Sequence, residues 1–581
     1  MRKTDLLPPS NGPSPAEGRS GKPAVVDGLR ETSTNRATKL SRQDGPSSTK
    51  RESYSSSSRG TLYTVFVITG AFLILLINSL QMTVVSSLSP YVTSDFNSHS
   101  LLPVTSLLSS VVTGVMQLPL SRIIDLYGRP QGLMAMITLD VLGLIIMATC
   151  TNVRAYAAAQ ILYYVGSDGV IYVIRVFAMD KVTVRTRSLV YGLSLYTYFV
   201  SPFAGPALAQ AFYDANIWRW GFGSLALIIP GVSSVLLSYF MWYERRYCLA
   251  SDEKSSPNKK TQSSIWTTVW FHVLNLDVMG VLLSCFGIGL ILLPLSLSTK
   301  SIKAWESSST ISMIVIGAIC LLALAIYEWR IAPRRFIDFN ILRDRTAWGA
   351  CLCMGGQSLS LYMWWSYYTS FLQVVHFQSI QHAGYILNTH QIGSALFSVI
   401  TGLVLKYTHR FKVVNAIGFA ITTLGTGLMI HYSFPSSSFA GVIGTHVLVS
   451  VSSGILAASE IAAVLNDTND ESMSMRVALL FLFSWIGSAV GSTIATPMWR
   501  SHFPSLLEKH LPPELKSQKD AIFGSLSIQL SYERGTAGRD AIIKAMTGTW
   551  WYLTVAGTAT LAIPEILWNK KLLGAKEGMA P

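Results

Sequence analysis

The sequence predicts an all-α membrane protein that crosses a lipid bilayer many times. Half of its 581 residues are hydrophobic and only 13% are charged, whereas a soluble protein carries about 25% charged residues. Apolar runs of roughly twenty residues, the length that a helix needs to cross a bilayer, recur along the whole chain. Composition and run length together exclude an ordinary soluble domain.

Each apolar run is expected to form one membrane-spanning helix. The first six lie near residues 61–82, 101–120, 131–151, 156–178, 188–211 and 221–243. Two more lie near 276–298 and 309–329. The last six lie near 347–374, 382–405, 413–432, 438–464, 475–498 and 549–568. The prediction is therefore fourteen transmembrane helices.

Three polar segments lie outside these runs. Residues 1–59 are rich in Ser, Pro, Gly, Lys and Arg, and such a composition cannot bury enough apolar surface to fold. We expect this segment to be a disordered cytosolic tail. A cytosolic linker is expected over 244–275, and a short cytosolic tail over 571–581.

Lysine and arginine gather in alternate loops, and this bias sets the predicted orientation. The basic set comprises Arg122, Arg129, Lys181, Arg185, Arg187, Arg245, Arg246, Arg330, Arg334, Arg335, Arg343, Arg345, Lys406, Arg410 and Lys412. Cytosolic loops of membrane proteins carry such an excess, so both termini are expected in the cytosol. Because the net charge of +14 is spread over loops and has no interleaved aromatic residues, a nucleic-acid partner is not expected.

A short charged turn separates the second and third runs. Gly128 and Pro130 end one helix and start the next, and Asp125, Arg122 and Arg129 can pair across the gap. The spacing resembles the cytoplasmic loop signature of the major facilitator superfamily, although Ser121 stands where glycine is usual and Leu126 where a basic residue is usual. This loop is the predicted conformational switch.

A weak repeat of the turn follows the tenth run. The stretch from Gly402 to Arg410 restores the glycine, keeps the late arginine and loses the aspartate. The repeat predicts two pseudo-symmetric six-helix lobes, 60–243 and 330–570, with an inserted helix pair over 276–329. In such transporters the substrate site lies between the halves near the middle of the membrane.

The fourth run carries a polar stripe. Gln160, Tyr164, Asp168, Tyr172 and Arg175 recur at intervals of three and four, which places them on one helix face. Asp168 and Arg175 are two turns apart, roughly 10 Å along the axis, too far for a tight pair. The stripe is either a cavity lining that contacts substrate or relays protons, or a buried structural network.

Other ionisable groups lie within predicted spans, where a charge costs about 2.5–3.5 kcal/mol. They are Asp140 in the third span, His390 in the tenth beside Asn388, and Glu460 in the twelfth. His390 is either a proton-coupling group or a packing residue, and Glu460 is expected to reach toward water from its helix end. Gln81 stands where many fourteen-helix relatives have aspartate, which weakens coupling through that position.

Several kinds of site are not found in the sequence. No phosphate-binding glycine loop ends in Lys-Ser or Lys-Thr, so ATP is not the expected energy source. The six cysteines lack metal-finger spacing and are expected to be free thiols. Neither a metal-ligand cluster nor a hydrolytic triad is present, so no enzyme activity, metal or cofactor is predicted. Gly487 and Gly491 form a small-residue face that predicts close helix packing.

Longer stretches resemble the fungal siderophore–iron transporter family over about residues 60–570. The matching stretches run from Arg334 to Phe339, Leu342 to Arg345, Tyr367 to His376, Ala383 to Ile386, Asn216 to Gly221, and Asp180 to Arg187. A long segment near 500–548, external by parity, also resembles that family in its Ser-Tyr and Arg-Asp-Ala core. The resemblance suggests that Tyr532, Arg539 and Asp540 help to capture substrate; the alternative for Tyr532 is that it folds the loop.

The resemblance implies an importer of ferric hydroxamate siderophores, driven by proton symport with alternating access. The chelate coordinates the iron, so the protein needs no metal ligands. A monomer in the plasma membrane is expected, with an endosomal or vesicular pool as the alternative location. Alternative functions are a glutathione:proton exchanger, a drug:proton antiporter, or a nutrient sensor that transports nothing. A degraded antiporter motif around Gly205 and Pro206 argues against the drug antiporter.

Overall fold

The structure is a computed structural model, and it describes residues 58–95, 102–180, 182–215, 217–247, 277–297, 307–330, 344–408, 410–466, 473–524 and 526–571. The chain divides into two units, Met1–Phe66 and Val67–Pro581, and the packing described below lies within the second. The predicted linker falls almost wholly, and the C-terminal tail almost entirely, outside the described residues. The same holds for nearly all of the N-terminal tail and for the motif from Arg334 to Phe339.

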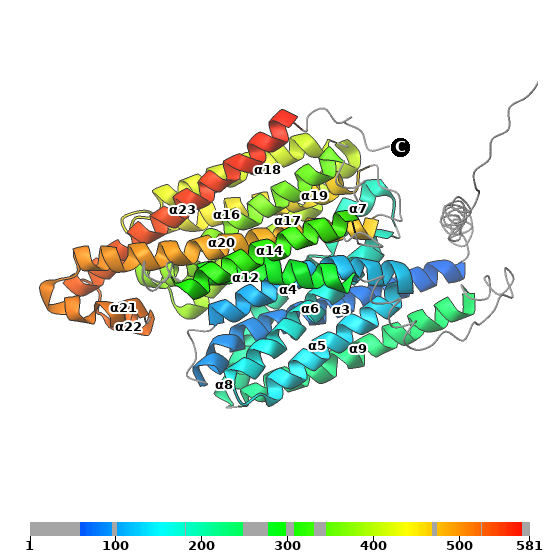
Figure 1. Cartoon of the computed structure of the whole chain (residues 1–581), viewed down its shortest axis with the longest axis horizontal. Coiled ribbons are helices and arrows are strands. Elements are labelled where there is room, and N and C mark those ends of the chain that lie inside the picture. The colour runs from blue at the N-terminus through cyan, green and yellow to red at the C-terminus, as the bar shows by residue number, and fades with distance from the viewer. Residues whose placement is uncertain are drawn as a thin grey trace, which may run out of the picture. The chain divides into compact units, whose positions relative to one another are not determined.

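All regular structure in the described residues is helical (Figure 1). The first group of helices is α3 (Ser58–Asp95), α4 (Leu102–Tyr127), α5 (Arg129–Thr149), α6 (Val153–Asp180), α7 (Val184–Leu193), η2 (Tyr196–Phe199), α8 (Ser201–Asp214) and α9 (Trp218–Tyr247). A pair follows, α12 (Val278–Leu297) and α14 (Ser308–Arg330). The last group is α16 (Arg345–Val375), α17 (Ile380–Thr408), α18 (Phe411–His431), α19 (Phe439–Val464), α20 (Met473–His510), η4 (Pro513–Gln518), α21 (Lys519–Gly524), α22 (Leu526–Ser531) and α23 (Ala537–Lys571).

Helices occupy all of the predicted apolar runs. Seven of those in the described residues are long and apolar enough to cross a membrane by length and composition alone. Helices α16 and α17 fall outside that set and carry polar side chains such as Gln357, Ser358 and His390. The all-helical membrane fold is confirmed, and the number of fourteen spans stays a prediction.

The fifth run forms three short helices rather than one. Helix α7 ends at Leu193, η2 makes a single tight turn, and α8 starts at Ser201. Pro202 stands second in α8, where its missing N–H is tolerated. The helix is therefore interrupted in the middle of the run, where one continuous helix was expected.

Glycines bring α5 and α6 into close contact. A Cβ on Gly143 would lie 2.6 Å from the backbone nitrogen of Tyr163, and one on Gly166 would lie 2.3 Å from that of Asp140. In the last group the same device joins α20 to α16. A Cβ on Gly487 would lie 2.1 Å from the carbonyl oxygen of Gly355, and Gly491 is as tightly placed against Leu359. The predicted packing role of Gly487 and Gly491 is confirmed.

The first and last groups meet along two pairs of helices, α4 with α20 and α7 with α17. Gly114 of α4 lies against Trp485 of α20, and Gly402 of α17 lies against the backbone of Leu189 of α7. The two contacts are counterparts under the predicted repeat, in which α4 corresponds to α17 and α7 to α20. The division into lobes stays a prediction.

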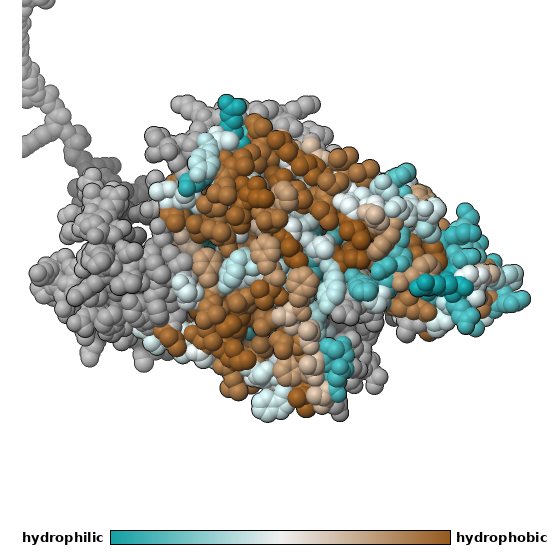
Figure 2. Space-filling model, turned by 180° about the vertical axis from the view of Figure 1, so that it is seen from behind, coloured by the Kyte–Doolittle hydropathy of each residue, from teal (hydrophilic) through white to brown (hydrophobic). Residues whose placement is uncertain are grey.

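The pair α12 and α14 lies beside this assembly. Helix α12 packs on α4, α20 and α14, and Gly287 and Gly317 let the pair approach closely. Helix α14 leaves large apolar side chains such as Leu322 and Trp329 more than half exposed. Figure 2 shows apolar residues covering most of the described face, with hydrophilic residues gathered at one end. An exposed apolar belt of this kind suits contact with lipid.

Helices α20 and α23 extend far into the predicted external segment 500–548. They contain 38 and 35 residues, or about 57 and 52 Å of helix, well beyond the roughly 30 Å of a bilayer core. Short helices η4, α21 and α22 join their far ends (Figure 1). The segment is therefore mostly helical rather than an open loop.

Candidate substrate cavity and gate network

The polar stripe of α6 is buried or half-buried inside the helix assembly. Gln160 and Tyr172 are about 1% exposed, and Tyr164 and Asp168 are half-buried. The Tyr164 ring meets that of Tyr163 edge to face, with centroids 5.1 Å apart. The stripe thus faces protein and not lipid, as the sequence predicts.

Asp168 and Arg175 do not form an ion pair. Arg175 donates from Nε to Ser194 Oγ at 3.2 Å, at the C-cap of α7, and lies over the Tyr191 ring of α7 at 5.3 Å. One carboxylate oxygen of Asp168 has no hydrogen-bond partner. The Asp168 carboxylate lies within electrostatic range of the Tyr362 hydroxyl on α16. The arginine therefore joins α6 to α7, while the aspartate faces the last group of helices.

Asp140 belongs to a second buried cluster. It is fully buried, accepts a hydrogen bond from Gln81 Nε2 at 2.7 Å, and leaves its Oδ2 without a partner. Asn78 on the same helix as Gln81 donates to the Ser167 carbonyl at 3.2 Å. Gln81 thus has an acid as its hydrogen-bond partner.

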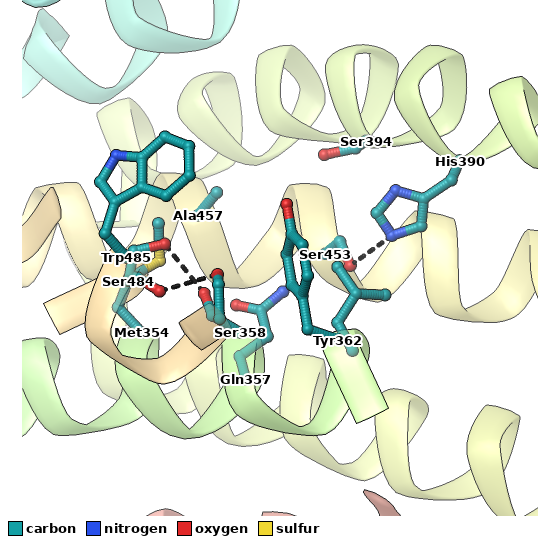
Figure 3. Close-up of a pocket in the computed structure, with 12 residues that line it drawn as sticks. Met354, Gln357, Ser358, Tyr362, His390, Ser394, Ser453, Ala457, Ser484 and Trp485 are labelled. Carbon is teal, nitrogen blue, oxygen red and sulfur yellow. Dashed lines mark hydrogen bonds between the residues drawn. The ribbon is translucent and has the colours of Figure 1, made fainter. Parts of the chain in front are cut away.

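A cavity of about 220 Å³ lies among α16, α17, α19 and α20. Its polar lining includes Gln357, Tyr362, His390, Ser453 and Ser488, with Trp485 beside them (Figure 3). Ser358 and Ser484 share a hydrogen bond of 2.8 Å across α16 and α20. Gln357 Oε1 is buried and has no partner. The lining residues that the structure describes offer hydroxyl, amide and imidazole groups, and none of them is Asp, Glu, Lys or Arg.

His390 projects from α17 into this cavity, as Figure 3 shows. Its Nε2 lies 3.1 Å from Ser453 Oγ, and its ring meets Trp365 edge to face at 5.1 Å. The ring of His446 lies 5.9 Å away. His390 is thus both a packed residue and a cavity residue, so the two predicted roles remain compatible.

Asn388 lies outside the cavity. Its Nδ2 donates to the Pro202 carbonyl at 3.1 Å, which joins α17 to α8. Near it the rings of Phe203 and Tyr385 lie 5.8 Å apart. Asn388 therefore connects the first and last groups of helices.

The predicted switch turn forms an ion network. Arg129 contacts Asp125 Oδ1 and Asp180 Oδ2, each at 2.8 Å. Gly128, which precedes α5, has φ 99° and ψ 162°, a region open essentially to glycine alone. The predicted pairing of Asp125 with Arg129 is found, with Asp180 as a further partner. Arg122 lies on α4 one turn before Asp125 and is half-buried.

The network extends to the last group of helices through Ser474, at the start of α20. Ser474 Oγ donates to Asp125 Oδ1 at 2.8 Å, and Tyr172 donates from its hydroxyl to the Ser474 carbonyl at 2.5 Å. On the other side, Ser188 Oγ of α7 donates to the Ala458 carbonyl at 2.7 Å. We call this closed end of the assembly, marked by Asp125, Ser188, Gly402 and Ser474, the gate end.

The repeated turn also lies at the gate end, with a different pairing. Arg410 precedes α18 and is exposed. Arg476 of α20 instead pairs with Asp344 Oδ2 at 2.7 Å and donates to the Val464 carbonyl at 3.2 Å. This pair, which the motif does not predict, ties together the starts of α16 and α20 and the end of α19.

In the segment predicted to capture substrate, Tyr532 and Arg539 serve folding. Tyr532 donates to Gln518 Oε1 at 2.9 Å. Arg539 is 3% exposed and donates to the carbonyls of Gln529 and Val374, the latter at 3.1 Å. Asp540 lies in the first turn of α23 and is exposed. The geometry thus favours the loop-folding alternative for Tyr532, and of the three residues only Asp540 points its charge to the surface.

The expectation for Glu460 is wrong. Glu460 does not reach water, because its side chain is 0% exposed and neither carboxyl oxygen has a hydrogen-bond partner. The reason is that α16, α18 and α7 all approach this part of α19: Cys351, Cys353 and Tyr191 lie within range of its charge. The sequence places Glu460 near a helix end, but it does not show that other helices cover that end.

Most of the cavity lining was missed from the sequence. Gln357, Tyr362, Ser453 and Trp485 lie in ordinary-looking spans, and serine or tryptophan in a membrane helix is too common to mark a site. A usable signal was present on α19, where His446, Ser450, Ser453, Ala457 and Glu460 recur at intervals of three and four. That spacing resembles the stripe on α6, its counterpart in the repeat.

Comparison with known proteins gives the family. The Major Facilitator Superfamily model matches residues 71–492. The chain is 35% identical over 507 residues to MFS siderochrome iron transporter 1 of Ajellomyces capsulatus, covering 87% of this chain and 85% of that protein. It is 35% identical over 498 residues to MFS siderochrome iron transporter D of Aspergillus fumigatus, with 86% and 82% covered. Siderophore iron transporter 1 of Schizosaccharomyces pombe is 34% identical over 488 residues, with 84% and 78% covered. The chain therefore belongs to the major facilitator superfamily and, within it, to the family of fungal siderophore–iron transporters.

Proposed function

We propose that this protein is a transporter that imports ferric siderophores of the hydroxamate type by proton symport. The observation that carries the proposal is the similarity to siderochrome and siderophore iron transporters over most of both chains. The chelate would bring its own iron ligands, so iron is cargo and no resident cofactor is needed. The proton gradient would supply the energy.

The cavity, lined by the last group of helices, supports a substrate site that faces the first group. Its polar groups come from α16, α17, α19 and α20, and Asp168 of α6 acts on its Tyr362 from the other group. Neutral hydroxyl and amide groups suit a chelate whose surface is amide and hydroxamate. At about 220 Å³ the cavity is smaller than the roughly 300–1,000 Å³ of drug-sized ligand sites. A bulky chelate would therefore enter only when the helix groups separate.

Alternating access gives the gate network its role. In this structure the gate end is closed by Asp125, Ser474, Tyr172 and Ser188. Opening it would break these few hydrogen bonds and part α7 from α17 and α4 from α20. Fourteen spans would place the gate end and both termini in the cytosol, with the α20–α23 extension outside. We further propose a monomer in the plasma membrane.

Uptake by cells tests the function. The full chain is expressed in a yeast strain that lacks siderophore uptake, and accumulation of radiolabelled ferrichrome-, fusarinine- and ferrioxamine-type chelates is measured with and without a protonophore. The expected result is uptake of at least one chelate that the protonophore abolishes. No uptake of any chelate by protein present at the cell surface would contradict the proposal. Export of glutathione, drug resistance, or signalling without uptake would instead indicate one of the alternative functions.

A further inference from the structure

Glu460 is a buried acid without a charge partner. It is 0% exposed, and neither carboxyl oxygen accepts a hydrogen bond. An ionised carboxylate in such a place lacks the pairing that buried charges require. In this conformation Glu460 therefore carries a proton.

Within the part of the chain that the structure describes, no cation donates a hydrogen bond to this carboxyl. Cys351 and Cys353 of α16 and Tyr191 of α7 lie within range of its charge. On α18, Asn415 lies near and donates from Nδ2 to Ser459 Oγ at 3.0 Å.

Charged side chains do occur farther along these helices. They are Arg476, which pairs with Asp344, and Arg187 and Lys412, about one helical turn from Tyr191 and Asn415 respectively. None of the three donates a hydrogen bond to Glu460, whose two oxygens have no partner. Burial among neutral groups therefore keeps the carboxyl group of Glu460 protonated.

The acid continues the cavity lining of α19. Ser453 and Ala457 line the cavity, and Glu460 follows Ala457 by three residues, about 4.5 Å along the helix. Ser453 bonds His390, whose ring neighbours His446. Cavity water beside Ser453 and Ala457 would therefore lie within about two helical turns of Glu460 along α19.

Glu460 also lies where the gate closes. Two residues before it, Ala458 accepts the hydrogen bond from Ser188 of α7. Close by, Gly402 packs on the backbone of Leu189. Parting α7 from α17 and α19 would therefore bring water to this stretch of α19.

From this arrangement we infer that Glu460 is the proton carrier of transport. It binds one proton at a carboxyl oxygen from cavity water when the gate end is closed. It releases that proton to a water molecule at the gate end when the gate opens. Each transfer breaks the O–H bond of the donor as the O–H bond of the acceptor forms. The inference rests on the proposed proton symport.

Two other acids compete for this role. Asp140 has Gln81 as a hydrogen-bond donor and lies on α5, away from the cavity lining. Asp168 lies within electrostatic range of Tyr362 in the cavity lining, but it shares the α6 stripe with Arg175, whose charge acts on it. Glu460 alone among the three combines full burial, no partner on either oxygen and a place beside a contact that must break.

The test uses the purified full chain in proteoliposomes with radiolabelled ferrichrome, or whichever chelate the cell assay identifies. Two reactions are measured: accumulation driven by an inward proton gradient, and counterflow, which requires no net proton movement. The variants are Glu460→Gln, Glu460→Asp and Asp168→Asn, and the control is Glu508→Gln, an exposed glutamate on the extension of α20. With one proton per chelate, one pH unit permits about tenfold accumulation.

The expected result is that Glu460→Gln reduces driven accumulation to a ratio of about one while counterflow stays within threefold of the wild type. Glu460→Asp and Glu508→Gln keep driven accumulation. Driven accumulation by Glu460→Gln at the wild-type level would overturn the inference, as would loss in Asp168→Asn alone. If Glu460→Gln also loses counterflow, the Glu460→Asp variant decides the question. Driven accumulation by Glu460→Asp supports the inference. Counterflow by Glu460→Asp without driven accumulation overturns the inference. A wild type that performs counterflow but ignores the gradient would refute proton symport itself.

Discussion

A single amide at the cavity illustrates what one residue can contribute to substrate binding. Gln357 is 9% exposed, and its Oε1 lacks a partner at the edge of the cavity. A buried acceptor without a partner is unfavourable, by about 1–3 kcal/mol. A donor group on the chelate would satisfy it, because the oxygen borders the space that the substrate would fill.

We therefore expect Gln357→Leu to raise the KM of chelate uptake. Loss of one hydrogen bond of about 0.5–1.5 kcal/mol corresponds to an increase of about two- to tenfold, with kcat little changed, because the bond would form in the bound ground state. Initial uptake rates over a range of chelate concentrations measure this. Gln210→Leu, an exposed position on α8, serves as the control. A fall in kcat at constant KM would contradict this role for Gln357.

Gly128 makes a second prediction at this scale. With φ 99° and ψ 162°, the residue occupies a region where a side chain costs about 1–3 kcal/mol. Gly128→Ala should lower the thermal stability of the purified protein and weaken the Arg129 network beside it. Gly231→Ala is the matched control, since a Cβ there meets nothing within 4 Å. Equal melting temperatures for the two variants would show that the turn adapts without strain.

Residues of the α6 stripe could be predicted from the sequence, because charged groups at helical spacing within a membrane span are rare. Asp168 and Arg175 stand out for that reason. The cavity lining of α16 and α19 could not be predicted so easily. Gln357 of α16 and Ser453 of α19 line the cavity together with His390 of α17 and Trp485 of α20, and no local sequence pattern predicts that these four helices meet.

Among the elements, the helices themselves were predictable and their interruptions were not. Each predicted run is helical, since about twenty apolar residues in lipid have few other ways to satisfy their backbone. The break between α7 and α8 ends just before Ser201 and Pro202, yet Pro119 and Pro230 lie inside continuous helices. Proline alone therefore does not identify a break.

The extension of α20 and α23 depends on one buried arginine. Arg539 joins α22 to α16 through the carbonyls of Gln529 and Val374, and burial lowers the pKa of its guanidinium. Removing it leaves two buried acceptors without their charged donor, a loss of about 1.5–3 kcal/mol per bond. The short helices η4, α21 and α22 should then open more often.

We expect Arg539→Ala to raise the rate at which proteinase K cleaves between Leu511 and Thr536 in intact cells by tenfold or more. Such cleavage follows the population of the opened state, and about 1.4 kcal/mol changes that population tenfold. Arg534→Ala is a close control. Both arginines lie over the Phe377 ring, Arg539 at 5.4 Å and Arg534 at 4.3 Å, but Arg534 is exposed. Similar cleavage of both variants would mean that ring contacts, and not the carbonyl bonds, hold the segment. Resistance of all variants in intact cells but not in lysed cells would place the segment in the cytosol.

At the scale of the whole molecule, the two helix groups are joined by contacts of two kinds. At the gate end, hydrogen bonds of Asp125, Ser188 and Ser474 accompany close glycine contacts. Nearer the opposite end the contact is sparser, as between Asn388 and Pro202. The sequence repeat indicates that the halves are related, but it is equally compatible with a conformation closed at the gate end and one closed at the opposite end. It therefore could not predict which end is closed here.

Gly402 offers the sharpest test of movement between the helix groups. A Cβ at this position would lie 2.5 Å from the Cα of Leu189, and backbone cannot rotate away as a side chain can. Gly402→Val should therefore disfavour the closed gate end by about 1–3 kcal/mol, or about 5–150-fold in the conformational equilibrium.

The readout is the rate at which a membrane-impermeant maleimide labels a cysteine placed at Ser453, in a chain without native cysteines and in vesicles exposing the cytosolic side. Gly427→Ala, where a Cβ meets nothing within 4 Å, should label at the parent rate. Faster labelling in Gly402→Val alone is expected if α7 and α17 separate to admit substrate. Unchanged labelling in a folded Gly402→Val protein would mean that the helices part elsewhere, and the gate network would then be structural.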